Sequence, residues 1–291
     1  MKPPRFEYVA AQKTDEAVAL LAQHGDRARI LAGGQSLIPL LNFRLASPDV
    51  LVDVNRVSEL AYIRAADSGV AIGALTRQHV LERADVVRAR WPILAEACHL
   101  IGHLPIRHRG TVGGSLAHAD PASELPAVMV ALEADFTAVK RGGHRTLPAD
   151  SFFTGLFATA LDPDEMLVEI HVPALPSRTG GAFVEIARRA GDFALVGVAA
   201  LVTLDDAGRA TRARLALCGA GPTPVRAREA ERVLTGQRPE GRALDDAADR
   251  AAAATDPPDD IHASAAFRRK LARHVARQAI ELAAQRVGGG A

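Results

Sequence analysis

The chain has 291 residues, which is more than one typical domain and predicts two units that share a contact surface. Its hydrophobic fraction is 48%, its charged fraction 24% and its formal net charge +1, so the composition argues against a nucleic-acid partner or an anionic membrane surface. The longest nearly apolar run, from Phe193 to Leu204, is shorter than the roughly 20 residues that span a bilayer, and the first residues resemble no export signal. No transmembrane segment is expected, and we expect a cytoplasmic location.

The first 55 residues alternate strand and helix signals. We expect strands at 6–9, 28–32 and 50–54, with helices at 14–24 and 36–41 between them. This pattern predicts a small β-α-β-α-β layer.

The middle of the chain, from residue 59 to 173, mixes short strands and helices without a regular alternation, which predicts an α+β unit. Pro92 should break or kink the second of the helices, because proline removes a hydrogen-bond donor and clashes with the preceding turn. The expected elements are strands at 70–72, 136–139 and 166–172 and helices at 76–83 and 86–100.

The composition changes after Pro173, where ALPSRTGG is typical of a connector. Strands at 195–204 and 212–218 are joined at DDAG, which predicts a hairpin. Three helical stretches follow, near 224–234, 241–254 and 264–286. We therefore expect a C-terminal α+β domain made of an antiparallel sheet and helices.

The first glycine-rich loop, AGGQS at 32–36, lies between an expected strand and an expected helix. Backbone amides at a helix N-terminus form a favourable site for an anion. Gly33 and Gly34 can adopt positive φ and let a phosphate approach the backbone, and the hydroxyl of Ser36 can add a donor. Short glycine loops are also common as plain turns, so this loop alone leaves both interpretations open.

The second loop lies in RHRGTVGGSLAHADPASEL, residues 107–125, where Gly110, Gly113 and Gly114 accompany the hydroxyls of Thr111 and Ser115. Few structural turns require so many glycines. Two glycine-rich loops that each offer backbone donors and a hydroxyl could hold the two phosphates of a dinucleotide from opposite sides.

This second loop ends at Asp120 and Pro121. Aspartate is a good N-cap and proline suits the first helical position, so we expect a helix from here to about Leu132.

A competing dinucleotide motif occurs in CGAGPTP, residues 218–224. It begins with Gly219 and Gly221, but Pro224 stands where the third glycine of the fingerprint belongs, and no parallel β-α-β unit is expected around it. A nicotinamide nucleotide site is therefore disfavoured here.

No constellation for acid–base, nucleophilic or metal chemistry is evident in the sequence. It contains no HExxH, GxSxG or Walker A motif, and the histidines flanking the second loop are given no proton-transfer role. Cys98 and Cys218 stand in no metal-ligand spacing, whereas an iron–sulfur cluster needs four protein ligands. We expect no catalytic side chain and no metal in this chain, and any iron–sulfur centre should lie on a partner.

Four segments together resemble the FAD-binding medium subunits of the molybdenum hydroxylases, the family of xanthine dehydrogenase and aerobic carbon monoxide dehydrogenase. The segments are AGGQSLIPLL, TVGGSLAHADPASELPA, EMLVEIHVP and ARRAGDFALVGVA. The resemblance implies an α+β fold: an FAD-binding module of the vanillyl-alcohol oxidase (PCMH) type over residues 1–175, with subdomains of about 1–55 and 56–175, and a C-terminal domain over 176–291.

The resemblance also implies which residues bind FAD. Glu124 stands where relatives commonly carry an acidic residue near the flavin, Leu167 packs against the isoalloxazine ring, and Phe193 replaces a tyrosine of carbon monoxide dehydrogenases. An aromatic ring can still stack on the flavin but lacks the hydroxyl. The implied set is Ala32, Gly33, Gly34, Gln35, Ser36, Leu37, Thr111, Val112, Gly113, Gly114, Ser115, His118, Asp120, Glu124, Leu167, Asp192 and Phe193.

By the same resemblance, the chain is an electron-transfer subunit that binds FAD non-covalently. Electrons would come from [2Fe-2S] clusters on a small partner subunit, supplied by a molybdenum cofactor on a large molybdopterin-binding subunit, in a dimer of heterotrimers. They would leave to NAD, a quinone or dioxygen. A stand-alone FAD-dependent oxidoreductase with its own organic substrate and a non-redox scaffold are the alternatives, because fold alone does not fix function.

Overall fold

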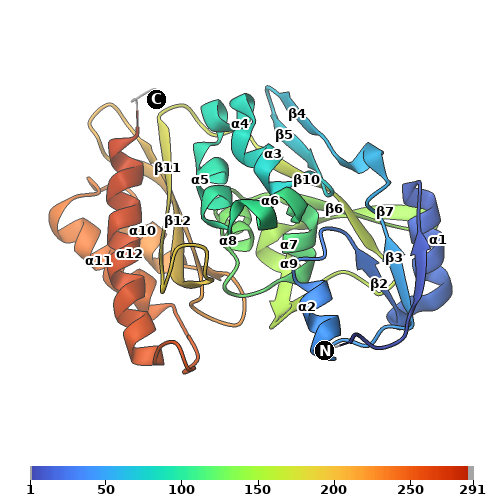
Figure 1. Cartoon of the computed structure of the whole chain (residues 1–291). Coiled ribbons are helices and arrows are strands. Elements are labelled where there is room, and N and C mark those ends of the chain that lie inside the picture. Colours follow the sequence, from blue (N-terminus) through green and yellow to red (C-terminus); the bar gives the residue numbers. More distant parts are fainter. Residues whose placement is uncertain (1, 288–291) are drawn as a thin grey trace.

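Three main sheets follow one another along the molecule, with helices between and around them (Figure 1). The computed structural model describes residues 2–287 of the chain. Within that range no helix is both long and apolar enough to cross a membrane.

The first sheet is parallel and has the strand order β1-β3-β2. Helix α1 covers it through Ala17, Val18 and Leu21, which are buried because they recur at the spacing of one helix face. The expected β-α-β-α-β layer is confirmed. Its elements are β1 (Glu7–Ala10), α1 (Thr14–His24), β2 (Ala28–Leu31), α2 (Leu37–Asn42) and β3 (Val50–Asp53).

The second sheet is antiparallel, with the order β4-β5-β10-β6-β7. Its strands and accompanying helices are β4 (Ile63–Ala66), β5 (Gly69–Gly73), α3 (Gln78–Arg83), α4 (Asp85–Arg90), α5 (Pro92–Leu100), α6 (Leu104–Arg109), α7 (Val112–His118), α8 (Glu124–Ala131), β6 (Asp135–Lys140), β7 (Gly143–Pro148), α9 (Ala149–Phe152), β8 (Phe153–Gly155), β9 (Ala158–Thr159) and β10 (Met166–Pro173).

The expected break at Pro92 is present, one residue earlier than the proline itself. Helix α4 ends at Arg90, and Pro92 occupies the first turn of α5, where its missing N–H costs nothing. Trp91 between the two helices is fully buried, and its indole N–H donates to the carbonyl of Pro173 at 2.9 Å.

The third sheet is antiparallel, with the order β11-β12-β13-β14, and contains the expected hairpin as β12 and β13. Strand β11 was not expected, because glycines depress strand propensity. Gly180 serves a packing purpose in β11: a Cβ there would lie 2.0 Å from the carbonyl oxygen of Ala283 in α12. The elements are β11 (Thr179–Ala187), β12 (Ala194–Leu204), β13 (Ala210–Cys218), β14 (Val225–Arg226), α10 (Arg228–Leu234), α11 (Gly241–Ala253) and α12 (Ala265–Gln285).

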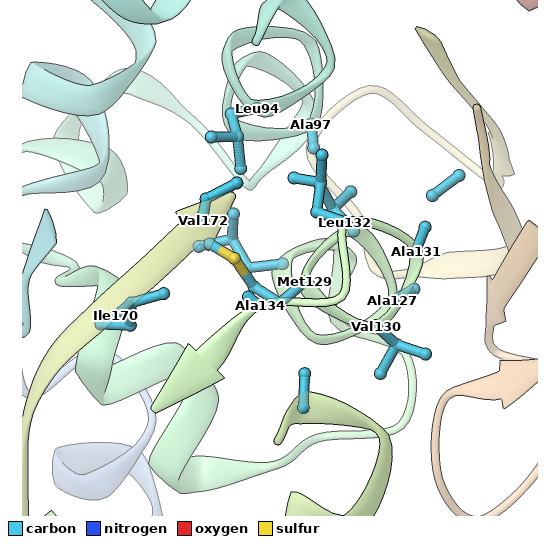
Figure 2. Packing of buried hydrophobic residues seen from close by; sticks show 14 of the residues in the cluster. Leu94, Ala97, Ala127, Met129, Val130, Ala131, Leu132, Ala134, Ile170 and Val172 are labelled. Carbon is cyan, nitrogen blue, oxygen red and sulfur yellow. The ribbon is translucent and has the colours of Figure 1, made fainter. Parts of the chain in front are cut away.

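The two faces of the third sheet belong to different cores. Helices α10 and α12 pack on one face, over residues such as Val196 and Val198, and α11 packs against these two helices. Phe183 and Cys218 point from the other face into the largest core, which is shared with α5, α8 and β10. Figure 2 shows part of that core; its labelled residues are Leu94, Ala97, Ala127, Met129, Val130, Ala131, Leu132, Ala134, Ile170 and Val172.

The α+β fold class is therefore as expected. The expected boundary near residue 175 falls between β10 and β11, and its use as a domain boundary stays a prediction.

Candidate cofactor site

The first glycine loop connects the end of β2 to α2. Gly34 has a φ of 74°, as expected, but Gly33 has no positive φ, so that part of the expectation is wrong. Glycine is required at position 33 for space instead. A Cβ there would lie 2.4 Å from the carbonyl oxygen of Arg109 and 2.9 Å from the Cα of Gly110. The first loop thus contacts the backbone that leads into the second.

The backbone amides of the first loop are open donors. Among the hydrogen bonds of residues 2–287, no carbonyl or side chain accepts from the N–H groups of residues 33–37. The side-chain amide of Gln35 donates to the carbonyl of Gly33 at 3.1 Å, and the hydroxyl of Ser36 does not cap α2. This run of amides without an acceptor in the described part of the chain is free to donate to a bound anion.

The second loop differs from its expectation. Val112 N–H donates to Thr76 O at 2.9 Å, and Ser115 N–H donates to Thr111 O at 3.1 Å. The amides of Gly113 and Gly114 are paired within the protein as well, so the backbone donors of residues 112–115 are not available to a ligand. Thr111 and Ser115 still carry hydroxyl hydrogens, for which no acceptor is found among residues 2–287.

Gly113 and Gly114 lie inside α7 rather than in a turn. Gly113 N–H donates to Ala74 O at 2.8 Å, and Gly114 N–H donates to the Oγ1 of Thr111, the N-cap of α7, at 3.1 Å. A Cβ at Gly114 would lie 2.6 Å from that Oγ1 and 3.8 Å from the Cβ of Ala32. Gly113 therefore allows close approach to Ala74, directly after β5, whereas Gly114 leaves room for the capping hydroxyl of Thr111.

His118 and Asp120 lie just after the second loop. The His118 ring packs at 5.1 Å from that of Phe157, and burial lowers the pKa of His118. Asp120 accepts from the amide of Ala122 at 2.9 Å and so closes a local turn. The expected helix start at Asp120 is therefore wrong: α8 begins only at Glu124.

Glu124 is a buried acid at the first position of α8, with 4% of its surface exposed. Burial raises its pKa to about 8, and the nearby charge of Glu185 contributes in the same direction. Burial also raises the pKa of Glu185 to about 7, and no hydrogen-bond partner of its Oε2 is found among the described residues. Glu185 lies in β11, which the sequence pattern did not reveal as a strand.

Leu167 lies in β10 beside the second loop. It is 5% exposed and pairs with Ala138 of β6. The next residue, Val168, accepts from the amide of Ala74, whose own carbonyl accepts from Gly113. Leu167 is therefore held one strand away from α7.

Asp192 and Phe193 belong to the turn between β11 and β12. Phe193 is 61% exposed. Gly191 has a φ of 85°, and a Cβ there would lie 2.4 Å from the Cε1 of His103, the residue before α6. The turn therefore reaches the segment that leads into the second loop.

The competing motif at residues 218–224 joins the antiparallel strands β13 and β14, which excludes the parallel β-α-β setting of a nicotinamide fingerprint. The amide of Gly219 donates to Pro121 O at 2.8 Å. Both cysteines are buried, and burial raises the pKa of each thiol. Within residues 2–287, no group of three or more His, Cys, Asp or Glu is placed to hold a metal ion.

Comparison with known proteins covers nearly the whole chain. Residues 4–175 match the family model "FAD binding domain in molybdopterin dehydrogenase", and residues 181–283 match "CO dehydrogenase flavoprotein C-terminal domain". The chain is 45% identical to the 6-hydroxypseudooxynicotine dehydrogenase complex subunit alpha of Paenarthrobacter nicotinovorans, over 98% of this chain and 97% of that one. It is 41% identical to the carbon monoxide dehydrogenase medium chain of Hydrogenophaga pseudoflava, over 97% and 98%.

Solved structures agree with these relatives. A carbon monoxide dehydrogenase structure from Hydrogenophaga pseudoflava matches with a TM-score of 0.96 and 42% identity, over 99% of this chain and 100% of that one. Quinoline 2-oxidoreductase from Pseudomonas putida 86 matches with a TM-score of 0.92 and 37% identity, over 98% and 99%. The chain therefore belongs to the family of FAD-binding medium subunits of the molybdenum hydroxylases and is an oxidoreductase subunit.

Proposed function

We propose that this chain relays electrons in a molybdenum hydroxylase complex, in which electrons from [2Fe-2S] clusters on a small partner subunit reach an external acceptor through FAD. The large partner would carry the molybdenum cofactor. The observation that carries the proposal is the contact between the two glycine loops, with the open amides of residues 33–37 at that contact. When bound, FAD supplies the redox chemistry, and the protein supplies its placement and its electrostatic surroundings.

The residues present fit a dinucleotide. Unpaired amides of the first loop can donate to a diphosphate, and Gly33 lets the backbone that leads into the second loop come close to them. Thr111 and Ser115 can add hydroxyl donors. The remaining proposed contacts are Ala32, Gln35, Leu37, Val112, His118 and Asp120 around the loops, and Glu124, Leu167, Asp192 and Phe193 toward the ring.

Partner subunits are supported by the cysteine count and by the relatives. The chain has 2 cysteines, fewer than the four ligands of an iron–sulfur cluster, and both are buried and apart in sequence. The relatives named above are a subunit alpha and a medium chain. The proposed assembly is a cytoplasmic dimer of heterotrimers in which this chain contains an FAD-binding domain, 1–175, and a C-terminal domain, 176–291.

Two preparations test the proposal: the chain alone, and the chain produced with its candidate partner subunits. Each is examined for the visible spectrum of flavin, for release of FAD on denaturation, and for reduction by carbon monoxide, purines, aldehydes and N-heterocycles. We expect releasable FAD in both preparations and reduction by one of these substrates only in the complex. Rapid reduction of the isolated chain by an organic donor would support the stand-alone oxidoreductase. A folded chain that cannot be loaded with FAD would support the scaffold.

A further inference from the structure

Asn55 ties the end of β3 to the first glycine loop. Its side-chain Nδ2 donates to the carbonyl of Ala32 at 2.8 Å and to the Oδ1 of Asp53 at 2.7 Å. Its own amide donates to the same Oδ1 at 2.8 Å. Hydrogen bonds of the Nδ2 group and of the backbone amide thus hold the Asn55 side chain in place, and its Oδ1 atom can accept a further hydrogen bond.

Arg77 uses that acceptor and reaches the second loop with the same guanidinium. Its Nη2 donates to Asn55 Oδ1 at 2.7 Å, and its Nη1 donates to the carbonyl of Arg109. The Arg109 carbonyl oxygen is also the atom that a Cβ at Gly33 would meet. The backbone of Arg77 is further bridged to Thr111. One planar cation therefore joins both glycine loops, through Asn55 on one side and directly on the other.

The charge of this guanidinium has no carboxylate partner among the ion pairs of residues 2–287. Burial, and after it the charge of Arg109, lowers the pKa of Arg77, which is the response of a cation short of counter-charge. Asp53, which accepts from Asn55 and from the Tyr8 hydroxyl at 2.6 Å, raises the pKa of Arg77, but by less than burial and the charge of Arg109 lower it. An anion held between the loops would compensate this charge.

We propose that Arg77, held by Asn55, is a positioning residue for the cofactor: it fixes the spacing of the two glycine loops and supplies the positive charge that a diphosphate needs. The inference rests on the proposed function, because it assumes that the loops hold the diphosphate of FAD. Lysine would keep the charge but would lose the rigid fork in which Nη1 and Nη2 each serve one acceptor, because its ammonium is a single nitrogen on a flexible stem.

The test uses the full chain stripped of FAD and titrated with FAD, and with ADP as a probe that carries the diphosphate without the flavin. The variants are Arg77→Met, Arg77→Lys and Asn55→Ala, together with the double variant. Arg56→Met is the matched control, because Arg56 is an exposed arginine next to Asn55 and makes no hydrogen bond to either loop among the described residues.

We expect Arg77→Met to weaken FAD and ADP by a similar factor, on the order of a hundredfold, and Arg77→Lys and Asn55→Ala to weaken both about tenfold. The double variant should be no weaker than Arg77→Met alone, because both changes remove one chain of contacts. The affinity of Arg77→Met should also depend less steeply on salt than that of the wild type. Arg56→Met should bind as the wild type does.

Arg77→Met that binds ADP within about twofold of the wild type, or Arg77→Lys that binds FAD as well as the wild type, would overturn the inference. If Arg77→Met does not fold, the lysine and Asn55 variants still decide. A wild-type chain that is folded but binds neither probe would instead refute the proposed function, so the two failures are distinguishable.

Discussion

A side chain at Gly33 would collide with the carbonyl oxygen of Arg109, since a Cβ built on Gly33 lies 2.4 Å from that atom. Backbone cannot move aside as a flexible side chain can. The contact therefore fixes how closely the two loops approach each other.

Gly33→Ala should weaken FAD binding by at least about tenfold, because the methyl group must push the loops apart. The measurement is a fluorescence titration of the FAD-free chain. Gly143→Ala is the control, because a Cβ at Gly143 meets nothing within 4 Å. Equal affinities for the two variants would contradict the contact as a determinant of the site.

Gly34→Val should abolish FAD retention, because a β-branched residue is strained at the φ of 74° found there. Strain alone could also lower stability, so the control is Gly236→Val. Gly236 has a φ of 82° with open space around it and lies in the turn after α10. We expect both variants to lose stability and only Gly34→Val to lose FAD; retention in both would refute the assignment of the first loop. FAD retention is measured by absorbance at flavin wavelengths after gel filtration.

The first loop could be located from the sequence because its signals are local. A strand, two glycines and a helix follow one another, and the structure keeps that order from β2 to α2. In the second loop, the same local reasoning failed on detail. Thr111 is an N-cap whose bond to Gly114 draws the glycines into α7, and Asp120 closes its own turn, so the next helix starts at Glu124.

Arg77 and Glu185 could not be predicted, because their contacts are with residues distant in sequence. Arg77 bonds to Asn55, 22 positions earlier, and to Arg109, 32 positions later. Glu185 lies in β11, a strand that its glycines make hard to predict. Its side chain approaches Glu124 only after the third sheet packs on α8. The sequence around each residue does not reveal contacts of this kind.

Glu124 should make stability fall as the pH rises. Its folded pKa is about 8 and the ordinary value is 4.5, so between these values the folded state holds a proton that the unfolded state has lost. The contribution is fully present below about pH 4.5 and is lost as the pH rises toward 8. Glu185, with a pKa of about 7, acts in the same direction over a lower range.

Glu124→Gln copies the neutral acid, so we expect it to melt at a higher temperature than the wild type at pH 9 and at a similar temperature at pH 5. Thermal unfolding of the FAD-free chain across this range gives the comparison. Glu240→Gln, at an exposed position, should follow the wild-type curve. Parallel curves for Glu124→Gln and the wild type would contradict a buried neutral Glu124.

Glu133 joins the middle of the molecule to the third sheet. It follows α8 with a φ of 54°, and its carboxylate accepts from Arg212, from Arg214 at 2.6 Å and from Arg226 at 2.9 Å. Burial alone would raise the pKa of Glu133, but the hydrogen bonds from Arg226 and Arg214 lower it below the ordinary value. Its contribution to stability is therefore present at neutral pH and lost as the pH falls through that lowered pKa.

Glu133→Gln should lower the free energy of unfolding at pH 7 by about 2 kcal/mol, because charged hydrogen bonds to guanidinium groups are lost. The difference from the wild type should shrink in acid. Glu229→Gln removes one partner of an exposed pair with Arg232 and should change stability by less than about 1 kcal/mol. Denaturant unfolding at pH 7 and in acid measures both; a similar small effect for both variants would show that the cluster at Glu133 is not coupling the two parts.

One face of the third sheet completes the same core as α5 and α8, with Phe183 and Cys218 among its members. This shared core limits the exchange of C-terminal parts between relatives. A chimera joined between β10 and β11 would keep both glycine loops from one parent, but the core side chains of the third sheet would come from the other parent and would not fit those of α5 and α8. We expect functional chimeras to require α8 and the strands it contacts, β12 and β13, from one parent. Among relatives, substitutions at the positions where α8 contacts β12 and β13 should occur in compensating pairs, so that the N-terminal and C-terminal parts of the subunit evolve together.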